Sequence, residues 1–178
     1  NDACYSREQS ERILSKKGLK TTGDKEIEVI RWILIDADPE RPAGVSSTDE
    51  EKAKSKETIK RVYKYLKQEG FSDPVVCDSG NGYHLLYSVD MNVDDADYTK
   101  KFLQTLDMLF SDEYVKIDTA VFNPARITKV YGTIARKGAN TPERPHRASG
   151  FVYIPEEIKK NSIHLLKKVI SVLPEKPK

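Results

Sequence analysis

The chain has little cysteine, no long hydrophobic run and no excess of one charge. Its two cysteines, Cys4 and Cys77, exclude a disulfide framework and a cysteine-rich zinc site. No apolar run approaches the ~20 residues that cross a bilayer. Thirty Lys and Arg residues oppose 28 Asp and Glu residues, so the formal charge of +2 excludes a uniformly basic coat. We therefore expect a soluble, cytoplasmic protein with no membrane partner.

The chain does have the length and the composition of one folded domain. Its 178 residues are 38% hydrophobic and 33% charged, which is typical of a globular protein with a charged surface. We expect one domain over residues 1–173. Residues 174–178, Pro-Glu-Lys-Pro-Lys, have the composition of a linker. Because the chain also begins without Met, we expect it to be a fragment of a longer protein, with another domain after the linker.

Hydrophobic periodicity predicts that strands alternate with helices. Strands are expected at residues 27–35, 75–77, 83–89 and 115–118. Helices are expected at residues 6–17, 49–69 and 94–110, and from Pro155 to about residue 170. Asn81-Gly82 indicates a hairpin between the second and third strands. The pattern predicts a mixed α/β (α+β) domain with an at least partly antiparallel sheet.

Three aspartates lie at the ends of two predicted strands. Asp36 and Asp38 are two residues apart, so both carboxylates point to one face, ~6–7 Å apart along the chain. Such charges repel unless a cation lies between them, and oxygen ligands suit Mg²⁺ or Mn²⁺. Asp118 ends another strand and could join them to form a two-metal site. Taken singly, each aspartate could instead be an ordinary strand-end residue.

A glycine-rich turn follows the second predicted strand. Its sequence is Ser79-Gly80-Asn81-Gly82-Tyr83-His84. Glycines let backbone N–H groups approach an anion, and Ser79 and His84 could add a hydroxyl and a cation. The turn is not a Walker loop, because no Gly-Lys-Ser/Thr follows. A phosphate cradle is one interpretation. The other is an ordinary Asn-Gly hairpin with His84 in the core.

Basic residues gather between residues 121 and 150. One acidic residue, Glu143, opposes six cationic ones there: Arg126, Lys129, Arg136, Lys137, Arg144 and Arg147. His146 lies in the same segment. Because the segment directly follows Asp118, its cations could hold a triphosphate or a nucleic-acid backbone near the acids. The alternative is a solvated charged face.

In this order, Asp36-Ala37-Asp38, the turn with His84, and Asp118 resemble the three motifs of archaeo-eukaryotic primases, the primase–polymerase superfamily. Further stretches are similar to primase–polymerases of phages, plasmids and CRISPR-associated operons. They are residues 35–44, 123–126, 131–133 and 137–138. The resemblance covers residues 21–150. It implies a catalytic module like an RNA-recognition motif, packed on a second α/β layer.

The resemblance also implies roles for single residues. Asp36, Asp38 and Asp118 would be the catalytic ligands of two Mg²⁺ or Mn²⁺ ions. The nucleotide would be held by Ser79, Gly80, Asn81, Gly82, His84, Arg126, Lys129 and Lys137. The template would be held by Tyr131, Arg136, Arg144, His146 and Arg147.

The function that we expect is a template-dependent DNA primase or polymerase that starts and extends primers. Its partners would be a single-stranded DNA template and deoxynucleoside triphosphates, with ribonucleotides as the alternative. A helicase or accessory domain would follow the chain. The sequence has no cysteine cluster for the zinc element of many primases, so extension is better supported than full priming. The rival interpretations are a non-catalytic single-strand-binding module and a metal-dependent nuclease.

Overall fold

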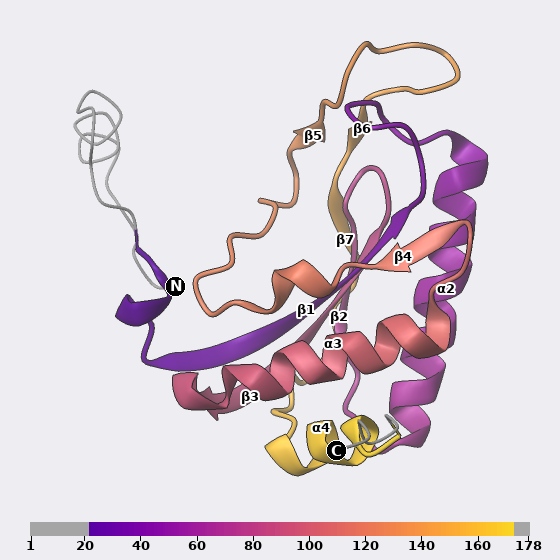
Figure 1. Ribbon diagram of the computed structural model, residues 1–178. Helices are drawn as coiled ribbons and strands as arrows, with labels where there is room; N and C mark the ends of the chain where they lie inside the picture. The colour runs from indigo at the N-terminus through magenta and orange to yellow at the C-terminus, as the bar shows by residue number, and fades with distance from the viewer. Residues whose placement is uncertain (1–21, 173–178) are drawn as a thin grey trace, which may run out of the picture.

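The computed structural model describes residues 22–172, and it shows a five-stranded sheet with three α-helices (Figure 1). The predicted helix at 6–17 and the linker at 174–178 lie outside the described residues. Between residues 22 and 172, no helix is both long enough and apolar enough to cross a membrane.

Every neighbouring pair of strands in the main sheet is antiparallel, which confirms the mixed α/β prediction. In spatial order the strands are β4 (Val115–Ile117), β1 (Val29–Pro39), β3 (Tyr83–Asn92), β2 (Val75–Asp78) and β7 (Gly150–Tyr153). A separate two-stranded sheet is formed by β5 (Ile134–Ala135) and β6 (Arg147–Ala148). The segment between β4 and β7 arches above the sheet, at the end opposite α4 (Figure 1).

Two of the described helices, those at residues 49–68 and 96–110, begin close to where the sequence predicts them. The helices are α2 (Asp49–Gln68), α3 (Ala96–Phe110) and α4 (Ile163–Ile170), with short 3₁₀ turns η1 (Asp24–Glu26), η2 (Val93–Asp95) and η3 (Thr119–Phe122). The capping box that starts α2 is present. The Glu51 N–H donates to Thr48 Oγ1 at 3.1 Å, and the Thr48 N–H donates to Glu51 Oε2 at 2.9 Å.

Side-chain alternation along β1 separates the core from the polar face. Ile33, Ile35 and Ala37 are fully buried and belong to the core that the helices complete with residues such as Val62 and Phe102. The residues between them on β1 are half-buried on the opposite face. Because successive side chains on a strand point to opposite faces, the aspartates at 36 and 38 both lie on that second face.

A buried hydroxyl ties α2 to the middle of the sheet. Ser55 Oγ donates to the Ala37 C=O at 2.6 Å and accepts from the Tyr83 N–H at 3.1 Å. A Cβ at Gly82 would collide with the same Ala37 oxygen, so the backbones of β1 and β3 approach closely there. This contact fixes the β2–β3 hairpin beside the end of β1.

The predicted start of the last helix at Pro155 is wrong, because α4 begins at Ile163. The residues before it are irregular, and Asn161 forms a single β-bridge with β3. The Asn161 backbone N–H donates to the Ser88 C=O at 2.8 Å, and its side chain accepts from the Ser72 N–H at 2.9 Å. These tertiary hydrogen bonds keep Asn161 out of a helix, and the sequence pattern contains no trace of them.

Candidate active-site cleft

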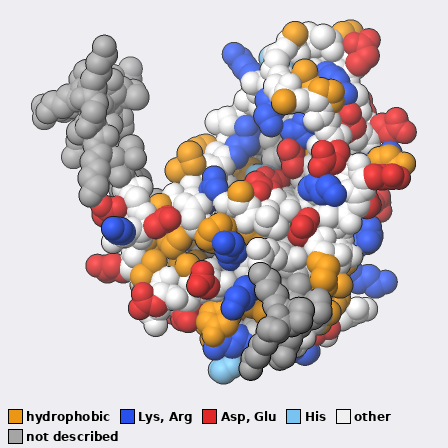
Figure 2. Space-filling view, viewed as in Figure 1, with side chains coloured by type: hydrophobic (Ala, Val, Ile, Leu, Met, Phe, Trp, Pro, Cys, Tyr) orange, Lys and Arg blue, Asp and Glu red, His pale blue; other side chains and the backbone are white. Residues whose placement is uncertain are grey.

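A cleft of about 470 Å³ opens where β1 meets β4, and all three predicted aspartates line it. Acidic side chains gather at the centre of the face shown in Figure 2, with Lys and Arg side chains beside them. Asp36 and Asp38 come from the end of β1 and Asp118 from the residue after β4. Residues 80 positions apart in sequence therefore meet in one cleft.

Strand pairing brings Asp118 beside Asp36. Ile117 is the antiparallel partner of Ala37, and the Asp118 N–H donates to the Asp36 C=O at 2.9 Å. The prediction that these aspartates are neighbours in a sheet is confirmed. Lys116 is opposite Asp38 in the same ladder and also lines the cleft.

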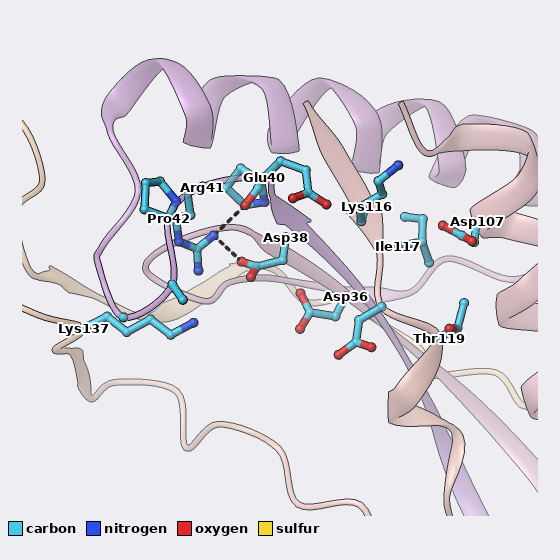
Figure 3. Close-up of a pocket in the computed structure, with 14 residues that line it drawn as sticks. Asp36, Asp38, Glu40, Arg41, Pro42, Asp107, Lys116, Ile117, Thr119 and Lys137 are labelled. Atoms are coloured by element: carbon cyan, nitrogen blue, oxygen red, sulfur yellow. Dashed lines mark hydrogen bonds and ion pairs between the residues drawn. The ribbon is translucent and has the colours of Figure 1, made fainter. Parts of the chain in front are cut away.

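Each of the three carboxylates has a partner in the protein, and the partner of Asp36 is His84, 3.3 Å away. The other two partners are an arginine and a backbone N–H. Asp38 Oδ1 lies 2.9 Å from Nη1 of Arg41, whose side chain is 5% exposed (Figure 3). The same guanidinium group donates to the carbonyls of Pro39 and Val45. Asp118 Oδ1 accepts from the Ala120 N–H at 2.7 Å. Both contacts use Oδ1, so each carboxylate keeps a second oxygen for a cation.

The donor chemistry of the cleft fits a hard divalent cation. Three carboxylates supply the oxygen ligands that Mg²⁺ and Mn²⁺ prefer. Among residues 22–172, however, no three His, Cys, Asp or Glu side chains converge tightly enough to hold a metal ion. Asp38 would have to share its carboxylate between Arg41 and the ion. The two-ion site therefore stays a prediction.

His84 is buried behind Asp36 and is held from both sides. Its side chain is on the aspartate face of β3, with 6% of the residue exposed. His84 Nε2 lies 3.3 Å from Asp36 Oδ1, and Nδ1 lies 2.7 Å from the Tyr131 hydroxyl. Burial, with a smaller effect of Cys77, raises the pKa of Tyr131, so its phenol stays protonated. If the Tyr131 O–H donates a hydrogen bond to Nδ1, the imidazole carries its proton on Nε2, and Nε2–H can donate to Asp36.

Tyr131 is thus part of the site rather than a free stacking platform. Its ring packs edge-on against His84, with centroids 5.9 Å apart, and lies 5.1 Å from the ring of Phe151. The sequence predicts a template contact for Tyr131 but gives no indication of its hydrogen bond to His84. The two residues are 47 positions apart, and no spacing rule links them.

The glycine turn uses its own backbone N–H groups. The Gly80 N–H donates to Asp78 Oδ1 at 2.7 Å, and the Gly82 N–H donates to Ser79 Oγ at 2.9 Å. The side chain of Asn81 accepts from the backbone of the loop before α2. These groups are what a phosphate cradle would need. The nucleotide-binding role of Ser79, Gly80, Asn81 and Gly82 stays a prediction that this geometry does not favour.

The predicted nucleotide-binding cations divide into two groups. Lys137 lines the cleft, and in Figure 3 its side chain extends toward the two aspartates of β1. Arg126 instead donates to the Ala120 carbonyl, and neither it nor Lys129 lines the cleft. Lys116, which is not among the predicted residues, also lines the cleft and is the ladder partner of Asp38. The signal was present, because Lys116 precedes Asp118 by two residues on a strand.

Two of the predicted template-binding arginines, Arg144 and Arg147, attach the segment between β4 and β7 to the start of α2. Arg144 forms a bidentate pair with Glu51, both N···O distances being 2.8 Å. Arg147 donates to Asp49 Oδ1 at 2.6 Å and to the Ser47 carbonyl at 2.7 Å. Their guanidinium groups thus have partners in the protein, which the sequence analysis did not predict. Their template role stays a prediction.

The remaining predicted template residues, His146 and Arg136, differ in their contacts with the rest of the protein. His146 Nε2 lies 2.9 Å from the Gly138 carbonyl, so its ring also fastens the loop. Arg136 is exposed beside β5. Of the predicted template set, Arg136 is thus the cation best placed to reach a ligand in solution.

The cleft combines carboxylates for a divalent cation with lysines for an anion. This combination suits a ligand such as a metal-bound polyphosphate. The chain matches no protein-family model, no curated protein and no solved structure.

Proposed function

We propose that the chain is the catalytic domain of a template-dependent DNA primase or polymerase. The observation that carries this proposal is one cleft lined by Asp36, Asp38 and Asp118 together with Lys116 and Lys137. The aspartates come from neighbouring antiparallel strands, as the motif order leads us to expect. The reaction would join the 3′-hydroxyl of a primer to the α-phosphate of a nucleoside triphosphate, releasing pyrophosphate.

We also propose that the fold is that of the archaeo-eukaryotic primases. An antiparallel sheet with helices on one face and acids on the other supports this proposal. The small β5–β6 sheet and the loop around it would contribute to the second layer.

The three aspartates would hold two Mg²⁺ or Mn²⁺ ions, which supply activation of the attacking hydroxyl and neutralisation of the leaving group. The protein's own residues do the rest. Lys116 and Lys137 offset the charge of the triphosphate. His84 orients the Asp36 carboxylate, and the Tyr131 hydroxyl fixes the imidazole ring in turn. Single-stranded DNA would pass beside Arg136.

Primer extension with a matched pair of variants tests the proposal. A labelled primer on a single-stranded template is incubated with deoxynucleotides and Mn²⁺. We expect Asp36→Asn/Asp38→Asn to lose activity by about 1000-fold, because metal binding supplies several kcal/mol of transition-state stabilisation. Asp90→Asn/Asp94→Asn removes the same charge from exposed positions outside the cleft and should extend like the wild type.

Each rival function would give a different result. Absence of incorporation by the wild type with either metal and either type of nucleotide would overturn the proposal. Strand shortening that depends on the aspartates would indicate a nuclease. Template binding without any reaction would indicate a binding module.

A further inference from the structure

A second groove, of about 320 Å³, lies on the other side of the sheet between α2 and β7. Its walls are three aliphatic and three aromatic side chains: Ile59, Val76, Val152, Tyr63, Tyr83 and Tyr153. Tyr83 directly precedes His84 on β3, so the two side chains lie on opposite faces. The groove is therefore separate from the aspartate cleft.

A row of lysines on α2 borders this groove. Lys56 and Lys60 line it, and Lys64 continues the row at the same four-residue spacing, ~6 Å per step along the helix. From Lys52 to Lys67 the helix carries seven cationic residues and one acid, Glu57, although Lys52 and Lys67 pair with Asp78 and Asp73 from other parts of the chain. Glu57 pairs with Lys60 at 2.8 Å, but both side chains are more than half exposed, so the pair is weak. The α2 side of the groove therefore presents Lys56, Lys60 and Lys64, although the whole chain is nearly neutral.

The β7 side of the groove is apolar and uncovered. Val152 and Tyr153 line the groove and are 56% and 47% exposed. Phe151 and Ile154 beside them are 57% and 53% exposed, but the Phe151 ring packs against Tyr131 on the aspartate side of the sheet. β7 is an edge strand of the described sheet, and these four residues include none of the charges that usually protect such an edge. Exposed apolar side chains beside an unpaired strand edge, such as those of Val152 and Tyr153, are typical of a contact surface.

We propose that this groove binds single-stranded nucleic acid. Lysines in a row complement a phosphate backbone, and the half-exposed ring of Tyr153 offers a face on which an unpaired base stacks. The ring of Tyr83 lies under the ammonium groups of Lys52 and Lys56, so it adds to the groove wall rather than a free stacking face. A duplex would not fit this chemistry, because its bases are already stacked on one another. The site goes beyond the proposed catalysis and does not depend on it, because no aspartate of the cleft takes part.

Anisotropy of a labelled oligothymidylate of about 20 residues tests the proposal. The protein carries Asp36→Asn/Asp38→Asn, and nucleotides and divalent ions are left out, so catalysis plays no part. Adding Lys56→Ala/Lys60→Ala should raise the Kd about ten-fold and make the slope of log K against log salt shallower by about 1.4. Adding Tyr153→Ala should raise the Kd about ten-fold and leave the slope unchanged.

The matched control is Lys159→Ala/Lys160→Ala. These exposed lysines pair with Glu157 and with Asp90, and Asp90 is seven residues along β3 from Tyr83. The control removes the same charge away from the groove and should leave the Kd within about two-fold. An equal loss in both double variants would overturn the proposal, because it would show a general charge effect.

Photo-crosslinking locates the bound strand. An iodouracil-containing oligonucleotide should form adducts at Tyr83 or Tyr153. Adducts confined to residues 116–147 would place the strand in the aspartate cleft and overturn the proposal. Equal competition by polyglutamate would also overturn it, since the groove would then take an acidic peptide. If primer extension fails but these adducts form, the result supports nucleic-acid binding in the groove and contradicts the proposed catalysis.

Discussion

At Gly80, both the backbone conformation and the neighbouring residues favour glycine over any residue with a side chain. Gly80 and Gly132 have nearly the same positive φ, 94° and 95°. A Cβ at Gly80 would lie 2.5 Å from the Ala135 Cβ, whereas a Cβ at Gly132 would meet nothing within 4 Å. The two glycines therefore separate backbone strain from steric crowding.

We predict that Gly132→Ala lowers the free energy of unfolding by about 1–2 kcal/mol, the backbone cost alone. Gly80→Ala should lose this amount plus about 1–3 kcal/mol of overpacking against β5. Urea unfolding of the two variants and the wild type measures the difference. Equal losses would mean that Ala135 moves aside and that the turn is not tightly packed.

The aspartates of the cleft could be predicted from local sequence patterns, but their contacts with distant residues could not. Asp36, Asp38 and Asp118 could be selected because alternation and strand ends are local signals. The hydrogen bond between Tyr131 and His84 could not be predicted, because it forms only after the segment between β4 and β7 has folded over the sheet. The same holds for Arg41, whose place beside Asp38 depends on the irregular path of residues 40–48.

At the scale of elements, the start of α2 is where the arched segment is attached. Glu51 serves two purposes there, since it closes the capping box with Thr48 and accepts two hydrogen bonds from Arg144. Hydrogen bonds from Arg144, more than any other contact, lower the pKa of Glu51 in the folded protein. One carboxylate therefore joins a helix to a loop that is more than 90 residues away.

This link predicts a pH-dependent stability. The folded pKa of Glu51 lies below its ordinary value of 4.5, so its stabilising effect is complete above that value and is lost as the pH falls through the folded pKa. The difference in unfolding free energy between wild type and Glu51→Gln should thus be largest near neutral pH and shrink in acid. Urea unfolding across this range measures it.

Glu57→Gln is the matched control for this experiment. Glu57 is on the same helix, but its pair with Lys60 is exposed on both sides. Its substitution should change the unfolding free energy by less than about 1 kcal/mol at any pH. If the difference in unfolding free energy between wild type and Glu51→Gln does not change with pH, the charge of Glu51 is not what attaches the segment that carries Arg144.

Local patterns predicted the elements better than their connections. The capping box, the apolar stripe and the hairpin signal are contained in short windows, so α2 and the β2–β3 hairpin follow from the sequence. The start of α4 does not, because Asn161 is fixed by Ser72 and Ser88 from distant elements. The attachment of Arg144 and Arg147 to α2 escaped the sequence analysis for the same reason.

At the scale of the whole molecule, a bound metal ion should stabilise the entire fold. Three carboxylates line one cleft, and a ligand that binds only the native state raises its stability. We predict that Mn²⁺ at about 100 times its Kd adds about 2.7 kcal/mol, a Tm increase of roughly 5–10 °C. Thermal unfolding with and without Mn²⁺ measures it, and EDTA should reverse it.

Asp36→Asn/Asp38→Asn should lose this Mn²⁺ effect, while Asp90→Asn/Asp94→Asn should keep it. Without metal, two opposing effects act on the stability of the first variant, because it removes repulsion between the carboxylates and also the ion pair of Asp38 with the buried Arg41. A Tm increase of the same size in both variants would place the ion elsewhere and would count against the proposed metal site.

The alternation along β1 has a consequence for how the chain reaches its native state. If β1 paired with β3 one residue out of register, Asp36 and Asp38 would enter the aliphatic core and Ile35 and Ala37 would leave it. Burying two unpaired carboxylates costs far more free energy than exposing the side chains of one isoleucine and one alanine. The acids at the end of β1 therefore make misaligned sheets unstable during folding, whatever reaction they later support.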